Sequence, residues 1–159
     1  MTNLQRTTLA ALAATALALV LGARAYAQQS ARGEVLVVLA SEAAGQIDPQ
    51  LADIAALRQP PFSAFHTMQV LLRPEVTLTV GQPVQVPLPN GREVRLELME
   101  ITPQGRYRVR VSINRPDQHD YLPLLSVVAS PGEPFFVAGQ SFQGGTLVIG
   151  VRVGERAAR

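Results

Sequence analysis

Short stretches in which apolar and polar residues alternate follow one another along most of this chain of 159 residues. Residues 75–80 (EVTLTV) and 106–113 (RYRVRVSI) show the alternation most clearly. Because successive side chains of a β-strand point to opposite faces, such stretches indicate strands with one buried face. Turns rich in Gly and Pro separate the stretches, whereas a fold of βαβ units would need a helix between successive strands. The sequence therefore predicts a mainly β protein, an antiparallel β-sandwich or barrel-like sheet of about eight strands with one short helix near the mature N-terminus.

Three local patterns refine this expectation. Asn90-Gly91, between two alternating stretches, is the strongest short signal of a β-hairpin. Pro123 lacks the N–H that a central strand donates, so its strand is expected at a sheet edge or at a bulge. Asp48 and Pro49 suit the N-cap and the first position of a helix of about ten residues, too short to form a bundle. In chain order, the expected strands are residues 34–40, 65–72, 75–80, 84–88, 92–101, 106–113, 121–129, 135–138 and 146–153.

The first 27 residues are typical of a cleavable secretory signal. Residues 9–21 form an apolar run, shorter than the roughly 20 residues of a membrane-spanning helix, and residues 25–27 (AYA) form a small-x-small cleavage site. A retained N-terminal anchor is the alternative. No later stretch has the length of a membrane span, so we expect a protein of the periplasm or the cell exterior. The expected organisation is a signal peptide over 1–27, a flexible segment over 28–33, one β-rich domain over 34–153 and a polar tail over 154–159.

Composition excludes several function classes. The chain has no cysteine, which rules out thiol nucleophiles, thiol redox chemistry and thiolate zinc sites. All 14 basic residues are arginines, and cleavage of the signal would remove Arg6 and Arg24, leaving twelve arginines against twelve acidic residues. A mature chain without net charge and without lysine is not expected to bind nucleic acid.

Four arginines form the most suggestive surface feature. Arg106, Arg108 and Arg110 lie on the outward face of one expected strand, and Arg95 lies on the neighbouring strand. They are candidate contacts for an anionic glycan, a lipid headgroup or an acidic protein. The alternative is cross-strand pairing within the sheet, because a four-residue turn over 102–105 would place Glu97 opposite Arg110.

The loop Asp117-Gln118-His119-Asp120 is the other place where catalytic residue types gather. It could supply ligands to a metal ion or, with Ser141, the members of a Ser-His-Asp arrangement. Its spacing matches no established ligand pattern, and a solvated turn is the favoured interpretation. No metal ion or other cofactor is expected.

Residues 139–146 fall one residue short of a phosphate-binding loop, because Gly145 stands where the lysine is required. A strand follows instead of a helix whose N-terminus could face phosphates, so nucleotide binding is not expected and a hairpin connection is favoured. The same residues also miss the spacing of a hydrolase nucleophile elbow. Nearby, Phe135 and Phe136 cannot both point inward on a regular strand, so one is either covered by the helix or exposed as a hydrophobic contact.

Two resemblances can be drawn from the segments themselves. The stretch from Leu72 to Val153, with LPNGREVRLEL, GRYRVRVSINRP, YLPLL and PGEPFFVAGQSFQGGTLVIGVRV, resembles small secreted β proteins of Gram-negative bacteria that have no assigned function. A second resemblance, to the core region of outer-membrane secretins, is carried by three segments: RPEVTLTVGQPVQV, RYRVRVSI and GGTLVIG. This second resemblance implies one folding unit only, since the chain lacks the length of a multistrand pore. Neither resemblance assigns functional residues.

The expected function is that of a non-enzymatic exported β-domain that binds another cell-envelope component, a protein or a glycan, as an accessory of a secretion or pilus assembly. A small periplasmic hydrolase or metal-dependent enzyme using the loop from Asp117 to Asp120 is one alternative. Recognition of an anionic glycan or lipid headgroup by the arginine-bearing strand is another.

Overall fold

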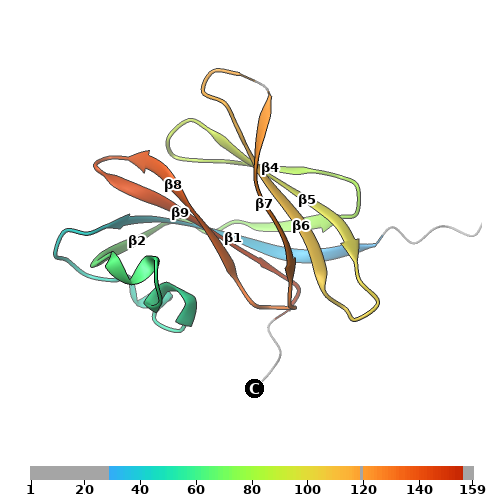
Figure 1. Ribbon diagram of the computed structural model, residues 1–159, viewed down its shortest axis with the longest axis horizontal. Coiled ribbons are helices and arrows are strands. Elements are labelled where there is room, and N and C mark those ends of the chain that lie inside the picture. Colours follow the sequence, from blue (N-terminus) through green and yellow to red (C-terminus); the bar gives the residue numbers. More distant parts are fainter. Residues whose placement is uncertain (1–28, 119, 156–159) are drawn as a thin grey trace, which may run out of the picture.

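Nine strands form two antiparallel sheets that lie face to face (Figure 1). The structure, a computed structural model, describes residues 29–118 and 120–155, so the expected signal sequence, His119 and the end of the tail lie outside the described residues. The mainly β sandwich predicted from the sequence is confirmed. The strands are β1 (Ser30–Ser41), β2 (Thr67–Leu72), β3 (Glu75–Thr79), β4 (Val84–Pro87), β5 (Glu93–Ile101), β6 (Tyr107–Asn114), β7 (Tyr121–Ala129), β8 (Phe135–Phe142) and β9 (Gly145–Val153).

The first sheet has the order β2-β1-β9-β8, and the second has the order β4-β5-β6-β7. β3 also belongs to the first sheet, because β1 is long enough to pair with two strands along one side: β3 pairs with its first half and β2 with its second half. Residues 30–33, expected to be flexible, are therefore part of β1, since their backbone pairs with β3 from Ser30 opposite Thr79 onward.

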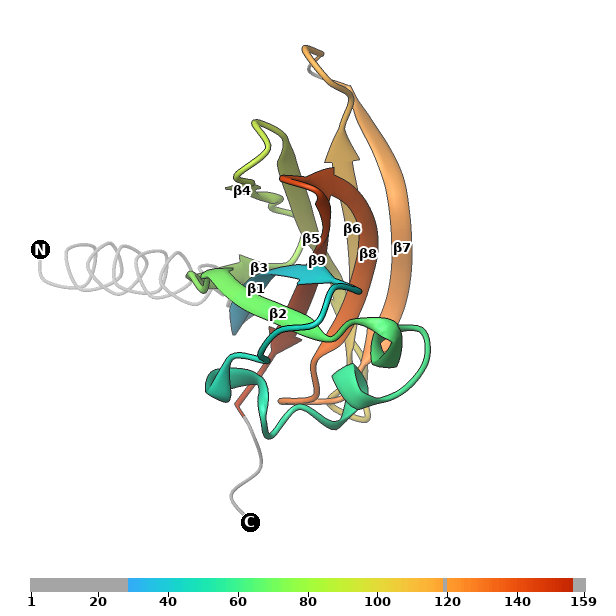
Figure 2. The same cartoon turned by 90° about the vertical axis from the view of Figure 1, so that its left-hand side faces the viewer.

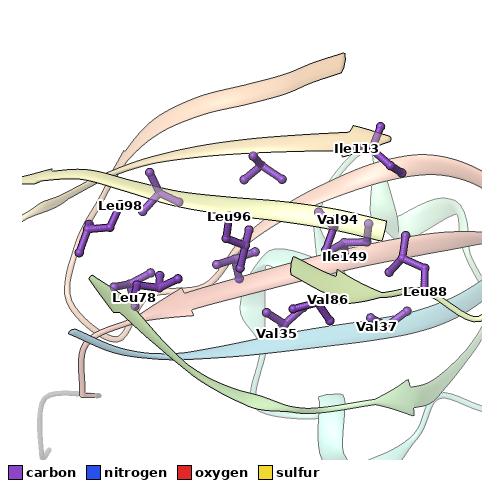
Figure 3. Packing of buried hydrophobic residues seen from close by; sticks show 14 of the residues in the cluster. Val35, Val37, Leu78, Val86, Leu88, Val94, Leu96, Leu98, Ile113 and Ile149 are labelled. Carbon is purple, nitrogen blue, oxygen red and sulfur yellow. The ribbon is translucent and has the colours of Figure 1, made fainter. Parts of the chain in front are cut away.

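The two central strands of the first sheet, β1 and β9, are buried on both faces. Val35 and Val37 point toward the second sheet, and Leu36 and Val38 point away from it. Figure 3 shows Val35, Val37 and Ile149 of the first sheet opposite residues of β5. Burying one such side chain stabilises the fold by about 1.5–3 kcal/mol. The inner cluster is formed by Val35, Val37, Leu78, Val86, Leu88, Val94, Leu96, Leu98, Val109, Val111, Ile113, Leu147, Ile149, Val151 and Val153, and the outer cluster by Leu36, Val38, Ala40, Leu51, Ile54, Leu57, Met68 and Val148.

The outer cluster is covered by the segment in which a helix is expected. Asp48 caps it as predicted, since its Oδ1 accepts a hydrogen bond of 2.9 Å from the Gln50 amide. The segment forms three separate 3-10 turns, Pro49–Leu51, Ala55–Arg58 and Phe62–Ala64, rather than one helix (Figure 2). Because a 3-10 turn has three residues, the buried apolar side chains can repeat at intervals of three along one side of the segment. Those side chains are Leu51, Ile54 and Leu57.

The turns follow the sequence signals closely. Gly91, with a φ of 79°, lies in the turn between β4 and β5, which confirms the Asn90-Gly91 hairpin. β8 continues past its expected end at residue 138, because Gly139 adopts a φ of 132° at a bulge and pairing with β9 then resumes. A hairpin at Gln143 and Gly144 joins β8 to β9, as favoured for this segment.

Gly150 of β9 offers a direct test of the outer packing. The ring of Phe136 lies over it, so that an added Cβ would come 2.5 Å from Cε1 of the ring, and Phe136 in turn packs edge-on against Phe62 with ring centroids 5.7 Å apart. We expect Gly150→Ala to lower the free energy of unfolding by about 1–3 kcal/mol in chemical denaturation, because the ring must move. In a Phe136→Leu background the same substitution should cost less. An equal loss of unfolding free energy in both backgrounds would show that the Phe136 ring is not the cause of the destabilisation.

Candidate functional site

The outward side of β5 and β6 carries the arginine face, defined as Arg95, Arg106, Arg108 and Arg110. Its orientation follows from alternation, since the intervening residues Val109 and Val111 are buried in the inner cluster. The hairpin register places Glu97 opposite Arg110, as predicted, and Glu100 opposite Arg108. Arg110 Nη1 lies 3.5 Å from Glu97 Oε2, and Arg108 Nε lies 2.9 Å from Glu100 Oε1.

The other two arginines of this face also have partners within the domain. Arg106 Nη2 donates a hydrogen bond of 2.8 Å to the carbonyl oxygen of Val128, and the Arg95 guanidinium lies 5.3 Å from the centroid of the Tyr121 ring. All four cations are thus engaged by the sheet that carries them. Because exposed ion pairs contribute only tenths of a kcal/mol to about 1 kcal/mol, an external anion could exchange with the glutamates at little cost.

Tyr121 links the arginine face to the end of the second sheet. Its hydroxyl donates a hydrogen bond of 3.0 Å to Glu93 Oε2, and its ring receives Arg95. Burial raises the pKa of Tyr121 above its usual value, and the hydrogen bond to Glu93 and the carboxylate charge raise it further, while Arg95 acts in the opposite direction. The neutral phenol is therefore the form that the fold favours.

The loop between β6 and β7 has the geometry of an exposed turn. Asp117, with a φ of 56°, and Asp120 are exposed, and Asp120 Oδ2 lies 3.1 Å from Arg115 Nε. Backbone hydrogen bonds within the loop close it, including one of 3.1 Å from the Arg115 amide to the Asp120 carbonyl. Across residues 29–118 and 120–155, no group of three His, Cys, Asp or Glu residues could hold a metal ion.

Ser141, the third member of the Ser-His-Asp arrangement considered above, lies on β8 in the first sheet, whereas Asp120 immediately precedes β7 in the second. The glycines around Ser141 serve the bulge and the hairpin of β8. The segment after them is strand β9, so in this part of the chain no helix N-terminus is available for a phosphate.

Phe135 and Phe136 point to opposite faces of β8, and neither is among the exposed large apolar residues of the described chain. Phe135 packs against the inner cluster. Phe136 packs against the outer cluster and against Phe62 of the third 3-10 turn. Of the two alternatives given for this pair, the structure therefore has the ring covered by the segment of 3-10 turns, and not exposed as a hydrophobic contact.

Sequence reasoning missed Arg92, which joins the two sheets. Its Nε donates a hydrogen bond of 2.9 Å to the carbonyl oxygen of Asn114 at the end of β6, Nη2 donates to the same oxygen, and Nη1 donates to Gln140 Oε1 on β8. Arg92 directly follows the hairpin turn. At this position no sequence pattern distinguishes an arginine that links two sheets from one that is simply solvated.

Sequence reasoning also missed a charged cluster on the outer face of β1 and β9. Glu34 pairs in register with Arg152, and its two oxygens lie 3.3 Å from Arg152 Nη1 and 3.0 Å from Arg73 Nε. A signal existed, because the two paired segments, residues 33–40 and 146–153, each contain a single charged residue, and antiparallel pairing brings these two together. The cluster borders an open, polar hollow of about 580 Å³ also lined by Arg32, Glu75 and Glu155.

Comparison of the chain with protein-family models, with curated proteins and with solved structures gives no match. In the described part of the chain, no helix is long and apolar enough to cross a membrane. A functional assignment therefore has to rest on the sequence and on the geometry given above.

The two kinds of arginine should differ in their effect on stability. We expect Arg92→Gln to lower the free energy of unfolding by about 1.5–3 kcal/mol, because it removes charged hydrogen bonds in a partly buried link between the sheets. The matched change Arg108→Gln, at a side chain that is 48% exposed, should cost less than about 1 kcal/mol. Denaturant titration measures both, and equal losses would refute a special role for Arg92.

The hydrogen bond from Tyr121 to Glu93 predicts that the Tyr121 phenol ionises at a higher pH in the folded protein. Since the pKa of Tyr121 is raised in the fold, its contribution to stability is present below the ordinary tyrosine pKa and is lost as the pH rises through the folded value. We expect ultraviolet absorbance to show Tyr121 ionising at higher pH than a free tyrosine, with Tyr121→Phe identifying the transition. Glu93→Gln should move it to lower pH. An unchanged midpoint in that variant would show that Glu93 does not hold the phenol.

Proposed function

We propose that this chain is an exported, non-enzymatic β-domain that acts by binding another component of the bacterial cell envelope. The N-terminal 27 residues, typical of a secretory signal, support export. Asp117 and Asp120 are both exposed and Asp120 is paired with Arg115, which supports a role other than catalysis for these two carboxylates.

The filled interior is the observation that carries this proposal. Side chains of both sheets occupy the inner cluster, and the 3-10 turns cover the outer cluster, so both faces of the central strands are closed by the domain itself. The hollow beside Glu34 is open, and both carboxylate oxygens of Glu34 already have arginine partners. With the interior filled by its own side chains, a partner would contact the outside of the domain, and this supports binding through the surface.

The arginine face is the charged part of that surface. Two of its arginines, Arg108 and Arg110, pair with glutamates from β5, and these exposed pairs are weak enough to be replaced by an acidic partner. Contact through this face predicts binding that weakens as the salt concentration rises, since exposed charges are screened within about 10 Å at 0.1 M ionic strength.

Retention of envelope components on immobilised protein tests the proposal. All nine strands and both clusters lie within residues 29–155, so a chain from Gln28 to Arg159 contains the complete core. We expect this chain to retain a defined protein or glycan from an envelope extract. Val37→Asp, which puts a charge into the inner cluster and should prevent folding, is the control for adhesion of unfolded chain.

A second variant, Arg108→Gln with Arg110→Gln, tests the arginine face within the same experiment. Loss of the retained component with the fold intact would assign the contact to this face. Retention no greater than that of the bare matrix or of Val37→Asp would rule out the proposed function.

A further inference from the structure

The hairpin between β4 and β5 turns at Asn90 and Gly91, a pair with a chemistry of its own. In an Asn-Gly pair the backbone nitrogen of the glycine can attack the side-chain carbonyl carbon of the asparagine, because glycine has no Cβ to obstruct the approach. The new C–N bond closes a succinimide ring, and the amide nitrogen of the asparagine leaves as ammonia with the proton of the glycine nitrogen. Water then opens the imide to aspartate or to isoaspartate, in which the main chain runs through the former side chain.

The turn itself requires this reactive pair. Gly91 has a φ of 79°, in the left-handed region that favours glycine, so a side chain that would slow the attack is strained at this position. Asn90 is held in the turn by its side chain, because its Oδ1 accepts a hydrogen bond of 3.2 Å from the Arg92 amide. The residues that shape the hairpin are therefore also the residues that can react.

The folded hairpin holds both reacting groups in other hydrogen bonds. The attacking nitrogen, that of Gly91, donates its N–H to the Leu88 carbonyl oxygen at 3.1 Å. The carbonyl group to be attacked, that of the Asn90 side chain, is oriented by its bond to the Arg92 amide. Both bonds have to open before the nitrogen can reach Cγ. In the folded protein the reaction therefore has to pass through an opened turn.

Further contacts oppose that opening. The Leu88 amide donates to the Arg92 carbonyl oxygen at 2.7 Å, and the Leu88 side chain, labelled in Figure 3, is only 5% exposed within the inner cluster. The Arg92 guanidinium donates to the Asn114 carbonyl oxygen on β6 and to Gln140 on β8. The turn is thus held closed from both sheets, and the same residues link its opening to the contact between them.

We propose that Asn90 is a site of spontaneous deamidation, that opening of the β4–β5 hairpin sets its rate, and that the isoaspartate product weakens the link made by Arg92. Isoaspartate lengthens the main chain by a methylene group between Asn90 and Gly91. The hydrogen bonds of Leu88 with Gly91 and Arg92 close a turn of ordinary length, so the longer chain displaces them and moves Arg92. The inference is independent of the proposed envelope partner.

Mass spectrometry of the folded chain and of a hairpin peptide tests the control of the rate. We expect Asn90 to react at least about tenfold more slowly in residues 28–159 than in a peptide of residues 84–97, which corresponds to an opening free energy of about 1.4 kcal/mol. Arg92→Gln should raise the rate in the folded chain about tenfold, because it removes charged hydrogen bonds that oppose opening. The same change in the peptide corrects for the altered neighbour, and Arg108→Gln should leave the folded rate unchanged.

Each of these rates can contradict the proposal. Equal rates in the folded chain and in the peptide would show that the turn does not protect Asn90. A peptide that does not deamidate would show that the pair is unreactive. A rate in folded Arg92→Gln equal to that of the wild type would show that the link between the sheets does not oppose opening.

Chemical denaturation of the separated product tests the last step. The isoaspartate form and the Asn90→Asp variant carry the same additional carboxylate and differ in the path of the main chain, so the variant is the matched control. We expect a lower denaturation midpoint for the isoaspartate form, and a smaller further loss on Arg92→Gln than in the wild type, because the link is already weakened. Equal midpoints for the isoaspartate form and Asn90→Asp would overturn the proposed effect on Arg92.

Discussion

Pairing between β1 and β9 is the interaction on which the rest of this structure depends. From Gly33 opposite Val153 to Ala40 opposite Thr146, the two strands form the centre of the first sheet, and both of their faces are buried. Such a pair requires a cover on each side. The second sheet provides one cover, and the 3-10 turns together with Phe136 provide the other. Glu34 and Arg152, the isolated charges of these strand cores, lie on the outer face and neutralise each other beyond the region that the turns cover.

The second sheet is built differently, and this difference determines where surface chemistry can lie. Only its inner face is buried, so its strands alternate and every second residue of β5 and β6 is free to be charged. The arginine face is the result, and glutamates of the same hairpin pair with two of its four arginines. The sheet ends at β7, which within the described chain pairs with β6 alone and has no charged side chain between Tyr121 and Ala129. The molecule therefore combines a closed interior with a charged outer face whose arginines have partners within the domain.

Alternation along the chain was sufficient to predict the sandwich, the Asn90-Gly91 hairpin, the edge position of Pro123 and the register that places Glu97 opposite Arg110, because each of these depends on local periodicity or turn chemistry. Burial on two faces leaves no periodicity, so EVLVVLA indicated a buried strand without indicating what covers it. The 3-10 turns depend on the sheet beneath them, and the continuation of β8 past Gly139 depends on pairing with β9. Arg92 links segments far apart in the sequence, and single-sequence patterns carry no information about such contacts. In the loop around Asp117, the two described carboxylates are exposed and that of Asp120 pairs with Arg115, while His119 lies outside the described residues.

Native-state hydrogen exchange, measured residue by residue by NMR, tests the central position of β1 and β9 most directly. If the other elements depend on this pair, its amides exchange only when the whole domain unfolds. The amides of Val35 to Val38 and of Leu147 to Val151 should then report an opening free energy equal to the global free energy of unfolding, while those of β4 and of the 3-10 turns report smaller values. Exchange of the β1 and β9 amides through openings as small as those of β4 would contradict this account.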